Sequence, residues 1–201
     1  MDLQSRTFSE GEMIPERCAY GRLGEGGKTV ASENANPHLA WSGAPEGTKS
    51  FVVACLDDDV PTNLEERDHS GEIPAGQIRR RFVHWVQANV DAATTEFPEG
   101  AFRHGAKTPK GFGLAGINDY SRGAVPEPGS VGTGYDGPCP PFFDARRHYY
   151  RFQVAALDVA KLEGLPKAFT WQDVEERMKG HVLATAELVG RYTLNPRLRG
   201  A

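Results

Sequence analysis

Acidic, histidine, tyrosine and proline residues gather in four short segments that could together hold a small molecule. The segments are Asp57-Asp58-Asp59-Val60-Pro61, His84-Trp85, Gly137-Pro138-Cys139-Pro140-Pro141 and His148-Tyr149-Tyr150-Arg151-Phe152. An imidazole N–H or a tyrosine hydroxyl can donate to an anionic oxygen, and a neutral histidine can gain a proton when an anion arrives. An ionised carboxylate such as Asp57 cannot donate, so we expect it to hold a histidine ring in one tautomer and favour its cationic form. The set favours an anion-binding cleft with rigid walls at Pro61 and Pro141.

Each segment also has a purely structural interpretation. Three consecutive aspartates usually form a solvated acidic turn, because burying an unpaired charge is costly. A lone histidine within an apolar strand, such as His84, is usually a hydrogen-bonded core residue. The proline-rich segment from Gly137 to Pro141 can be no more than a rigid turn. The functional interpretation therefore depends on whether the fold brings the four segments together.

Other chemistries stay open for the same residues. Two histidines and a carboxylate could bind a metal ion, and Cys139 with His148 could form a nucleophile and its base. The flanking prolines and Tyr150 suit an anion better, and nothing next to Cys139 indicates an activated thiolate. We therefore predict no metal, no cofactor and no catalytic residue. The alternative is an enzyme that uses the histidine, aspartate and tyrosine residues for acid–base chemistry on a small molecule.

Strand patterns surround three of these segments. Apolar or alternating runs predict strands at Lys49–Leu56, Arg81–Val90, His148–Leu157 and Ala184–Tyr192. The first run is almost wholly apolar, which is typical of a strand buried on both faces. Simple alternation in the second run places Val83 and Trp85 on one face and Phe82, His84 and Val86 on the other. The acidic segment then follows directly after a buried strand.

One helix and two long loops complete the prediction. Thr170 with Asp173 fits a capping box, and the apolar stripe of Trp171, Val174 and Met178 has helical spacing. This helix ends near Gly180 or runs on to Leu183. The segments 65–80 and 99–143 read as loops, and 23 glycines with 14 prolines argue against a helical bundle. We predict a mainly β protein in which residues 1–201 form a single domain.

Composition excludes several classes of protein. The net charge of −4 offers no basic excess for nucleic acid. No apolar run approaches the roughly 20 residues that span a bilayer, and the polar N-terminus has no signal-peptide pattern, so we expect a cytoplasmic protein without membrane insertion. Three cysteines argue against a disulfide framework. The segment 21–29 resembles a phosphate-binding loop, but Arg22 occupies its required first glycine, so we predict a glycine-rich turn.

The order of the four segments resembles the phosphatidylethanolamine-binding protein (PEBP) family, especially its bacterial YbhB/YbcL-like (Raf kinase inhibitor-like) branch. Asp57 to Pro61 matches the family's Asp-Pro-Asp-x-Pro motif except for Asp58 in place of proline. The His-Trp pair, the Gly-Pro-Cys-Pro-Pro turn and the His-x-Tyr-x-Phe strand follow in order. Weaker similarity at 36–50 and 181–192 extends the resemblance over about residues 10 to 193.

This resemblance implies a β-sandwich with a small C-terminal helix, long loops and one small pocket. In the family the pocket holds phosphate-like anions, including the head group of phosphatidylethanolamine. The ligand-binding positions carried over are Asp57, Asp59, Pro61, His84, Pro141, His148 and Tyr150, with Asp59 expected mainly to support its loop. The expected partner is a small ligand with a phosphate-like or phosphoryl head group. Regulation of a protein partner and a homodimer are further expectations by analogy alone.

Three segments depart from the family pattern. The segments 65–81 and 112–135 are longer than expected and could form lids or partner surfaces. The segment 142–147, Phe-Phe-Asp-Ala-Arg-Arg, replaces a turn that is usually rich in glycine. In this third segment we expect bulky Phe142 and Phe143 and basic Arg146 and Arg147 to alter what the pocket mouth accepts.

Overall fold

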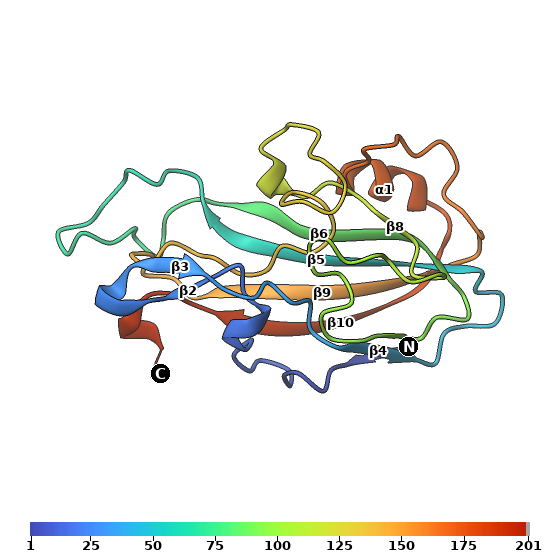
Figure 1. The fold of residues 1–201 in the computed structure, drawn as a ribbon, viewed down its shortest axis with the longest axis horizontal. Coiled ribbons are helices and arrows are strands. Elements are labelled where there is room, and N and C mark those ends of the chain that lie inside the picture. The colour runs from blue at the N-terminus through green and yellow to red at the C-terminus, as the bar shows by residue number, and fades with distance from the viewer. Residues whose placement is uncertain (200–201) are drawn as a thin grey trace.

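The apolar runs of the sequence form the long strands of one antiparallel sheet. The structure is a computed structural model that describes residues 1–199. Five strands lie side by side in the order β10-β9-β5-β6-β8 (Figure 1). Their bounds are β5 (Ser50–Pro61), β6 (Arg79–Asp91), β8 (Leu114–Ala115), β9 (His148–Leu157) and β10 (Val182–Tyr192). All four predicted strands are therefore confirmed.

Shorter elements cover the rest of the chain. A three-stranded sheet has the order β1-β4-β7, with β1 at Asp2–Gln4, β4 at Leu39–Ser42 and β7 at Glu96–Phe97. The glycine-rich segment is the hairpin of β2 (Gly21–Leu23) and β3 (Thr29–Ala31), as predicted for a turn. Four 3-10 turns are η1 (Glu16–Cys18), η2 (Glu25–Gly27), η3 (Asp119–Ser121) and η4 (Pro196–Leu198).

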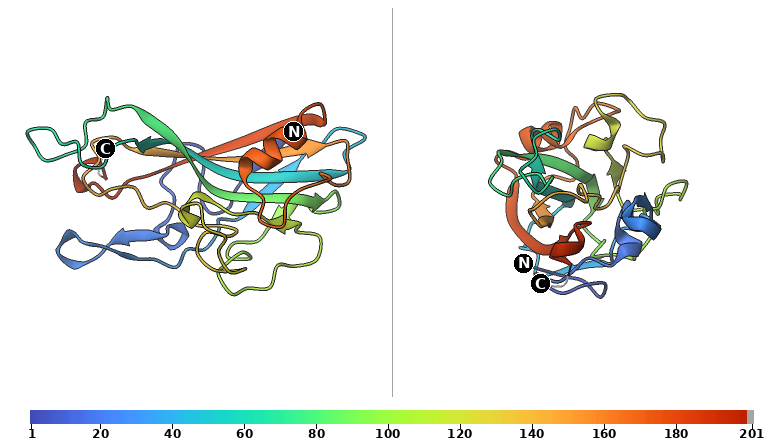
Figure 2. Two further views of the ribbon diagram at one scale, coloured as in Figure 1. Left: turned by 90° about the horizontal axis from the view of Figure 1, so that it is seen from above. Right: turned by 90° about the vertical axis from the view of Figure 1, so that its left-hand side faces the viewer.

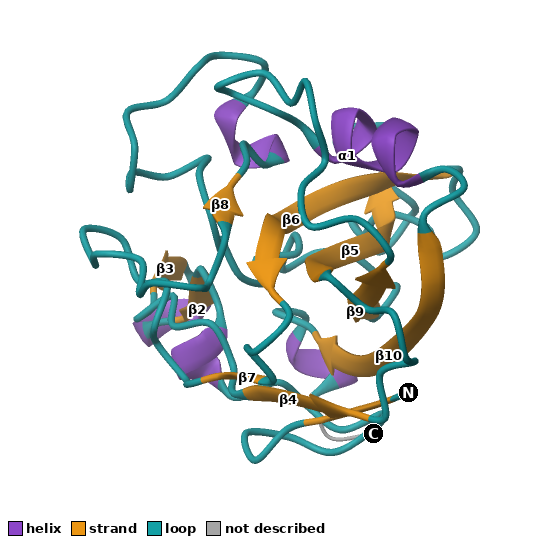
Figure 3. Cartoon of the chain, turned by 90° about the vertical axis from the view of Figure 1, so that its right-hand side faces the viewer, coloured by secondary structure: helices purple, strands orange, loops and turns teal. Residues whose placement is uncertain are grey.

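The large sheet buries both of its faces. Alternate residues of β5, Phe51, Val53 and Cys55, join the main core between the large sheet and the β1-β4-β7 sheet. The intervening Val52, Ala54 and Leu56 pack in a second core with α1 (Trp171–Met178). Figure 3 shows α1 on one side of the large sheet and β4 with β7 on the other, and Figure 2 gives two further views of the ribbon. The predicted mainly β sandwich with one small C-terminal helix is confirmed.

The capping box of α1 is also confirmed. The Thr170 hydroxyl accepts from the Asp173 amide, and the Asp173 carboxylate accepts from the Thr170 amide. The helix ends at Met178, and Gly180 follows with a left-handed φ of 80°, so an extension to Leu183 is wrong. Across residues 1–199 no helix has the length and apolar character to cross a membrane.

Two details of β5 and β6 differ from the prediction, and both shape the site. β5 does not end before the aspartates but continues to Pro61, with Asp57 paired to Tyr150 and to Phe82. In the pairing of β5 with β6, Cys55 lies opposite Trp85 and the next residue, Leu56, lies opposite Val83. His84 between them therefore has no partner in β5 and forms a β-bulge. The predicted face for Val83 is therefore wrong, because Trp85 lies in the main core and Val83 in the second core. An inserted residue reverses strict alternation.

The long loops contain more order than predicted. The first runs only to Ile78, since β6 begins at Arg79. It is attached to the 142–147 segment, because the Ile73 amide donates to the Phe143 carbonyl and the Ala145 amide donates to the Ile73 carbonyl. The segment 99–143 contains β8 and η3, which the sequence pattern did not predict.

Candidate functional site

A cavity of about 790 Å³ opens at the end of the large sheet from which the 62–78 loop projects (left in Figure 1). Strands β5, β6 and β9 supply its floor, and the segments 119–123 and 139–141 supply further walls. Six of the seven predicted site residues line it: Asp57, Pro61, His84, Pro141, His148 and Tyr150. The fold thus brings the four sequence segments to one place.

His148 lies between two carboxylates on the cavity floor. Its Nδ1 is 2.6 Å from Asp57 Oδ2 and its Nε2 is 3.1 Å from Asp144 Oδ2, and all three side chains are buried. Since carboxylates only accept, both ring nitrogens donate and the ring is an imidazolium. Burial lowers the pKa of His148, but the hydrogen bonds to Asp144 and Asp57 outweigh it and raise the pKa to about 9. His148 therefore supplies charge to the cavity but has no N–H left for a ligand.

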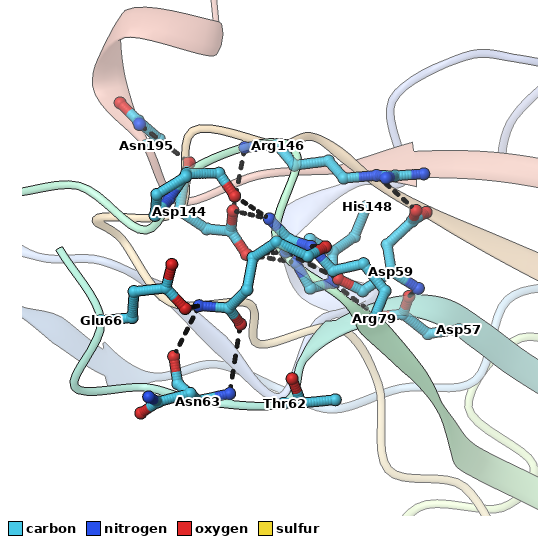
Figure 4. Close-up of polar contacts among 12 residues, drawn as sticks. Asp57, Asp59, Thr62, Asn63, Glu66, Arg79, Asp144, Arg146, His148 and Asn195 are labelled. Carbon is cyan, nitrogen blue, oxygen red and sulfur yellow. Dashed lines mark hydrogen bonds and ion pairs between the residues drawn. The ribbon is translucent and has the colours of Figure 1, made fainter. Parts of the chain in front are cut away.

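A buried arginine completes this network of charges (Figure 4). Arg79 binds Asp144 through both terminal nitrogens, at 2.6 and 3.0 Å, and donates to the backbone carbonyls of Asp59 and Pro74. Burial acts to raise the pKa of Asp144, but the hydrogen bonds from His148 and Arg79 outweigh it and the pKa is lowered. Two cations and two carboxylates thus alternate below the cavity, with Asp57 as the second carboxylate.

Asp59 is the predicted site residue that does not line the cavity. One of its oxygens is 2.7 Å from Nε of Arg146, and the other accepts from the Tyr149 amide at 3.0 Å. The backbone amide of Asp59 also donates to Asp57 Oδ1 at 2.7 Å. Asp59 therefore orders the β5–β9 edge and helps to position Asp57 (Figure 4).

His84 reaches the cavity as a neutral ring. Its Nδ1 lies 2.7 Å from the Asp136 carbonyl, which can only accept, so Nδ1 carries the proton. Burial lowers the pKa of His84, and the Asp57 carboxylate, 3.9 Å from Nε2, opposes this lowering only in part. Nε2 is therefore an unprotonated acceptor on the cavity side of the ring.

The Tyr150 hydroxyl is fully buried and has no hydrogen-bond partner in the described part of the chain. Its ring centroid lies 5.1 Å from that of His84 and 6.4 Å from that of His148. Burial raises the pKa of Tyr150 well above its usual range, so the hydroxyl keeps its proton. Leaving a buried hydroxyl unpaired costs about 1–3 kcal/mol, and a hydrogen-bond partner in the cavity would remove this cost.

Other chemistries find less support in this geometry. The described residues contain no group of three or more histidine, cysteine, aspartate or glutamate side chains placed to hold a metal ion. Burial raises the pKa of the Cys139 thiol, and both nitrogens of His148 are bound to carboxylates. Cys139 and His148 therefore do not form a nucleophile and its base.

A family model described as phosphatidylethanolamine-binding protein matches residues 4–193. The chain belongs to the phosphatidylethanolamine-binding protein family. It is 34% identical to a UPF0098 protein of Aquifex aeolicus, over 96% of this chain and 88% of that relative. It is 32% identical to UPF0098 protein YbhB of Escherichia coli, over 96% of this chain and 100% of that relative. The crystal structure of E. coli YbcL, titled a new member of the mammalian PEBP family, matches with a TM-score of 0.70 and 30% identity over 96% of this chain and 97% of that one. The structure of a putative PEBP homolog, CT736 from Chlamydia trachomatis, matches with a TM-score of 0.65 and 28% identity over 95% of each chain.

Several cavity residues of this PEBP-fold binding protein were missed in the sequence. They include Arg80, Phe82, Asp119, Tyr120 and Arg122. The signal for Phe82 was present, since alternation already placed it on the same face as His84. Asp119, Tyr120 and Arg122 gave no signal, because the glycine-rich 99–143 segment has no periodicity. Tyr120 packs against Phe82 and His84, and its hydroxyl donates to the Gly137 carbonyl.

Proposed function

We propose that this chain binds a small ligand through a phosphoryl group or a similar anionic group, seated at Tyr150 and His84. The observation that carries the proposal is the buried, unpaired Tyr150 hydroxyl. A protonated, buried phenol is a donor to an anionic oxygen, and hydrogen bonds to charged acceptors are the stronger ones. Such a ligand would satisfy the group that the chain itself leaves unpaired.

His84 adds the complementary acceptor. Its unprotonated Nε2 can accept from a P–OH group, or take a proton when a fully ionised phosphate arrives. In both cases one proton lies between the ring and a ligand oxygen. A phosphoryl group that has both P–OH and P–O⁻ therefore matches the acceptor at His84 and the donor at Tyr150.

His148 offsets the charge of the Asp57 carboxylate, which would otherwise repel the anion. The imidazolium is stacked beside the Tyr150 ring, and its two hydrogen bonds keep it cationic at neutral pH. In a buried site this charge is screened less than it would be in water. Pro61 and Pro141 give the walls a fixed shape without adding N–H groups.

The experiment is calorimetric titration of inorganic phosphate into the wild type and Tyr150→Phe at constant ionic strength. A hydrogen bond to a charged group contributes about 1.5–3 kcal/mol, so we expect Tyr150→Phe to weaken binding by about ten- to hundredfold. The matched control is Tyr149→Phe, because Tyr149 is the neighbouring residue and its side chain is exposed. Tyr149→Phe should bind phosphate like the wild type.

Thermal unfolding separates binding from folding. Because Tyr150→Phe removes an unpaired buried hydroxyl, its melting temperature without phosphate should equal or exceed that of the wild type. Phosphate should raise the melting temperature of the wild type and of Tyr149→Phe, and not that of Tyr150→Phe. Equal affinity of Tyr150→Phe and wild type would contradict the proposal.

A further inference from the structure

The cavity is larger than a phosphate group requires. Its volume of about 790 Å³ falls within the range of about 300–1,000 Å³ that is usual for pockets of small organic ligands. A phosphate is only a few times larger than a water molecule, which takes up about 30 Å³ in the liquid. A phosphate at Tyr150 and His84 therefore leaves most of the cavity unfilled. The remaining walls should therefore show what the rest of the ligand carries.

Two arginines line the cavity and are exposed to solvent: Arg80 in β6 and Arg122 after η3. Within residues 1–199 neither side chain forms an ion pair, and the guanidinium of Arg80 lies 5.6 Å from the centroid of the Phe82 ring. Both sequence neighbours of Arg80 are paired, Arg79 with Asp144 and Arg81 with Asp58. Arg80 and Arg122 are thus uncompensated cations on the wall of an otherwise balanced site.

The backbone at Arg122 strengthens this observation. Arg122 has a φ of 53°, in the left-handed region that glycine adopts without strain, and Gly123 follows with a φ of 81°. In this region the Cβ of a residue with a side chain lies too close to the following carbonyl oxygen, so the backbone is strained. The chain thus places an arginine where glycine would be more stable, a kind of strain that often accompanies ligand contacts.

The carboxylates on these walls leave room for another negative charge. Besides Asp57, which is bound to His148, the cavity is lined by Asp119, whose Oδ2 accepts from the Val83 amide at 2.8 Å. His148 and Asp57 offset each other, which leaves Asp119 beside Arg80 and Arg122, and within residues 1–199 Asp119 forms an ion pair with neither arginine. A single anion at Tyr150 would not engage the two arginines.

We infer that the ligand carries a second anionic group, which Arg80 and Arg122 hold while its phosphoryl group occupies the Tyr150 and His84 position. The inference rests on the proposed function and narrows its ligand class to phosphorylated compounds with a carboxylate or a second phosphate. The aromatic rings of Phe82 and Tyr120 pack against the part of the ligand between the two charges. A phosphorylated compound that ends in an ammonium group is disfavoured, because two unpaired arginines face it.

The test compares three probes of similar size that share a phosphate. They are 3-phosphoglycerate, which ends in a carboxylate, glycerol 3-phosphate, which ends in a hydroxyl, and phosphoethanolamine, which ends in an ammonium. Exposed ion pairs contribute up to about 1 kcal/mol each, so with one or both arginines engaged 3-phosphoglycerate should bind about five- to thirtyfold more tightly than glycerol 3-phosphate at low salt. Phosphoethanolamine should bind most weakly of the three, and the preference should decrease as salt is raised.

The variants are Arg80→Gln, Arg122→Gly and the double variant that combines them. Arg122→Gly removes the charge and relieves the left-handed strain, so the variant should fold at least as well as the wild type. The double variant should bind 3-phosphoglycerate and glycerol 3-phosphate equally. The matched control is Arg22→Ala, an exposed arginine in β2 that does not line the cavity.

The outcomes separate this inference from the proposed function. If phosphate binds to the wild type but the three probes bind equally, or if the double variant retains the preference, the second anionic position is refuted and the phosphate position stands. If phosphate fails to bind at all, the proposed function is wrong. A preference that Arg22→Ala abolishes would indicate a general charge effect and would also refute the inference.

Discussion

His148 is expected to make the stability of the folded chain depend on pH in the alkaline range. The pKa of His148 is raised from 6.5 to about 9 because Asp57 and Asp144 hold its protonated form in place. A histidine whose pKa is higher in the folded than in the unfolded chain contributes stability that is fully present below pH 6.5. This stability is lost as the pH rises through 9. At 1.36 kcal/mol for each pH unit, the difference corresponds to about 3 kcal/mol.

The assay is urea unfolding of the wild type and His148→Gln between about pH 6 and pH 10. A comparison is needed because burial also raises the pKa of Cys18 and Cys55, so their ionisation in the unfolded chain destabilises both proteins at alkaline pH. The difference in free energy of unfolding between the two proteins removes that shared contribution. We expect this difference to fall by about 3 kcal/mol between pH 6.5 and 9.5.

Two results would refute this reasoning. The first is that the two stability curves run parallel across the range, so that the difference does not change with pH. The second is a direct NMR titration in which the His148 ring changes protonation near 6.5. Asp57→Asn provides a further check, because it removes one of the two carboxylates that hold the proton and should lower the pKa of His148.

Three further predictions concern the support of the site. Arg79→Leu leaves the buried Asp144 without its bidentate partner and should lower the free energy of unfolding by about 3–5 kcal/mol in urea titration; a loss below about 1 kcal/mol would contradict the network. Thr170→Ala removes the helix cap and should cost about 1 kcal/mol, while phosphate affinity in calorimetry stays at the wild-type value. Gly137→Ala places a Cβ 2.1 Å from the Cys18 carbonyl, so the turn must move, and both melting temperature and phosphate affinity should fall.

Hydrophobic pattern was enough to predict the elements that carry the site. The strand at His148–Leu157 has the predicted bounds, because its alternation follows a regular ladder with β10 and with β5. The helix was equally readable, since its capping residues, its apolar stripe and Gly180 are all local signals. Such signals need no knowledge of the rest of the fold.

The hydrophobic pattern did not predict the positions of residues that depend on how two strands pair. The bulge at His84 depends on how β6 aligns with β5, and no residue in the run Arg81–Val90 marks it. The three aspartates were expected after the strand, yet Asp57 is paired within it on both sides. Partners distant in the sequence stabilise each of these positions: His148 binds Asp57, and Arg146 binds Asp59.

The loop residues were unpredictable for a different reason. Tyr120 and Arg122 lie in a segment without periodicity, and their place on the cavity wall follows from the turn η3 and its attachment to β6. Asp119 makes that attachment by accepting from the Val83 amide, a contact between residues 36 positions apart. A single sequence does not indicate contacts between such distant residues, so this part of the cavity wall could be identified only from the structure.

The 142–147 segment changes what the histidine of the His-x-Tyr-x-Phe strand can do. Asp144 comes from this segment and binds Nε2 of His148, while Asp57 from the acidic motif binds Nδ1. With one carboxylate, the ring would keep a nitrogen free to contact an anion; with two, it is a buried cation that cannot donate further. The direct donor role therefore passes to the Tyr150 hydroxyl, which is buried, protonated, unpaired among the described residues and part of the cavity lining. The indole N–H of Trp85 is also buried and unpaired, but Trp85 lies in the main core and does not line the cavity. A net charge of −4 does not oppose anion binding here, because the charge that matters is the one held within the cavity wall.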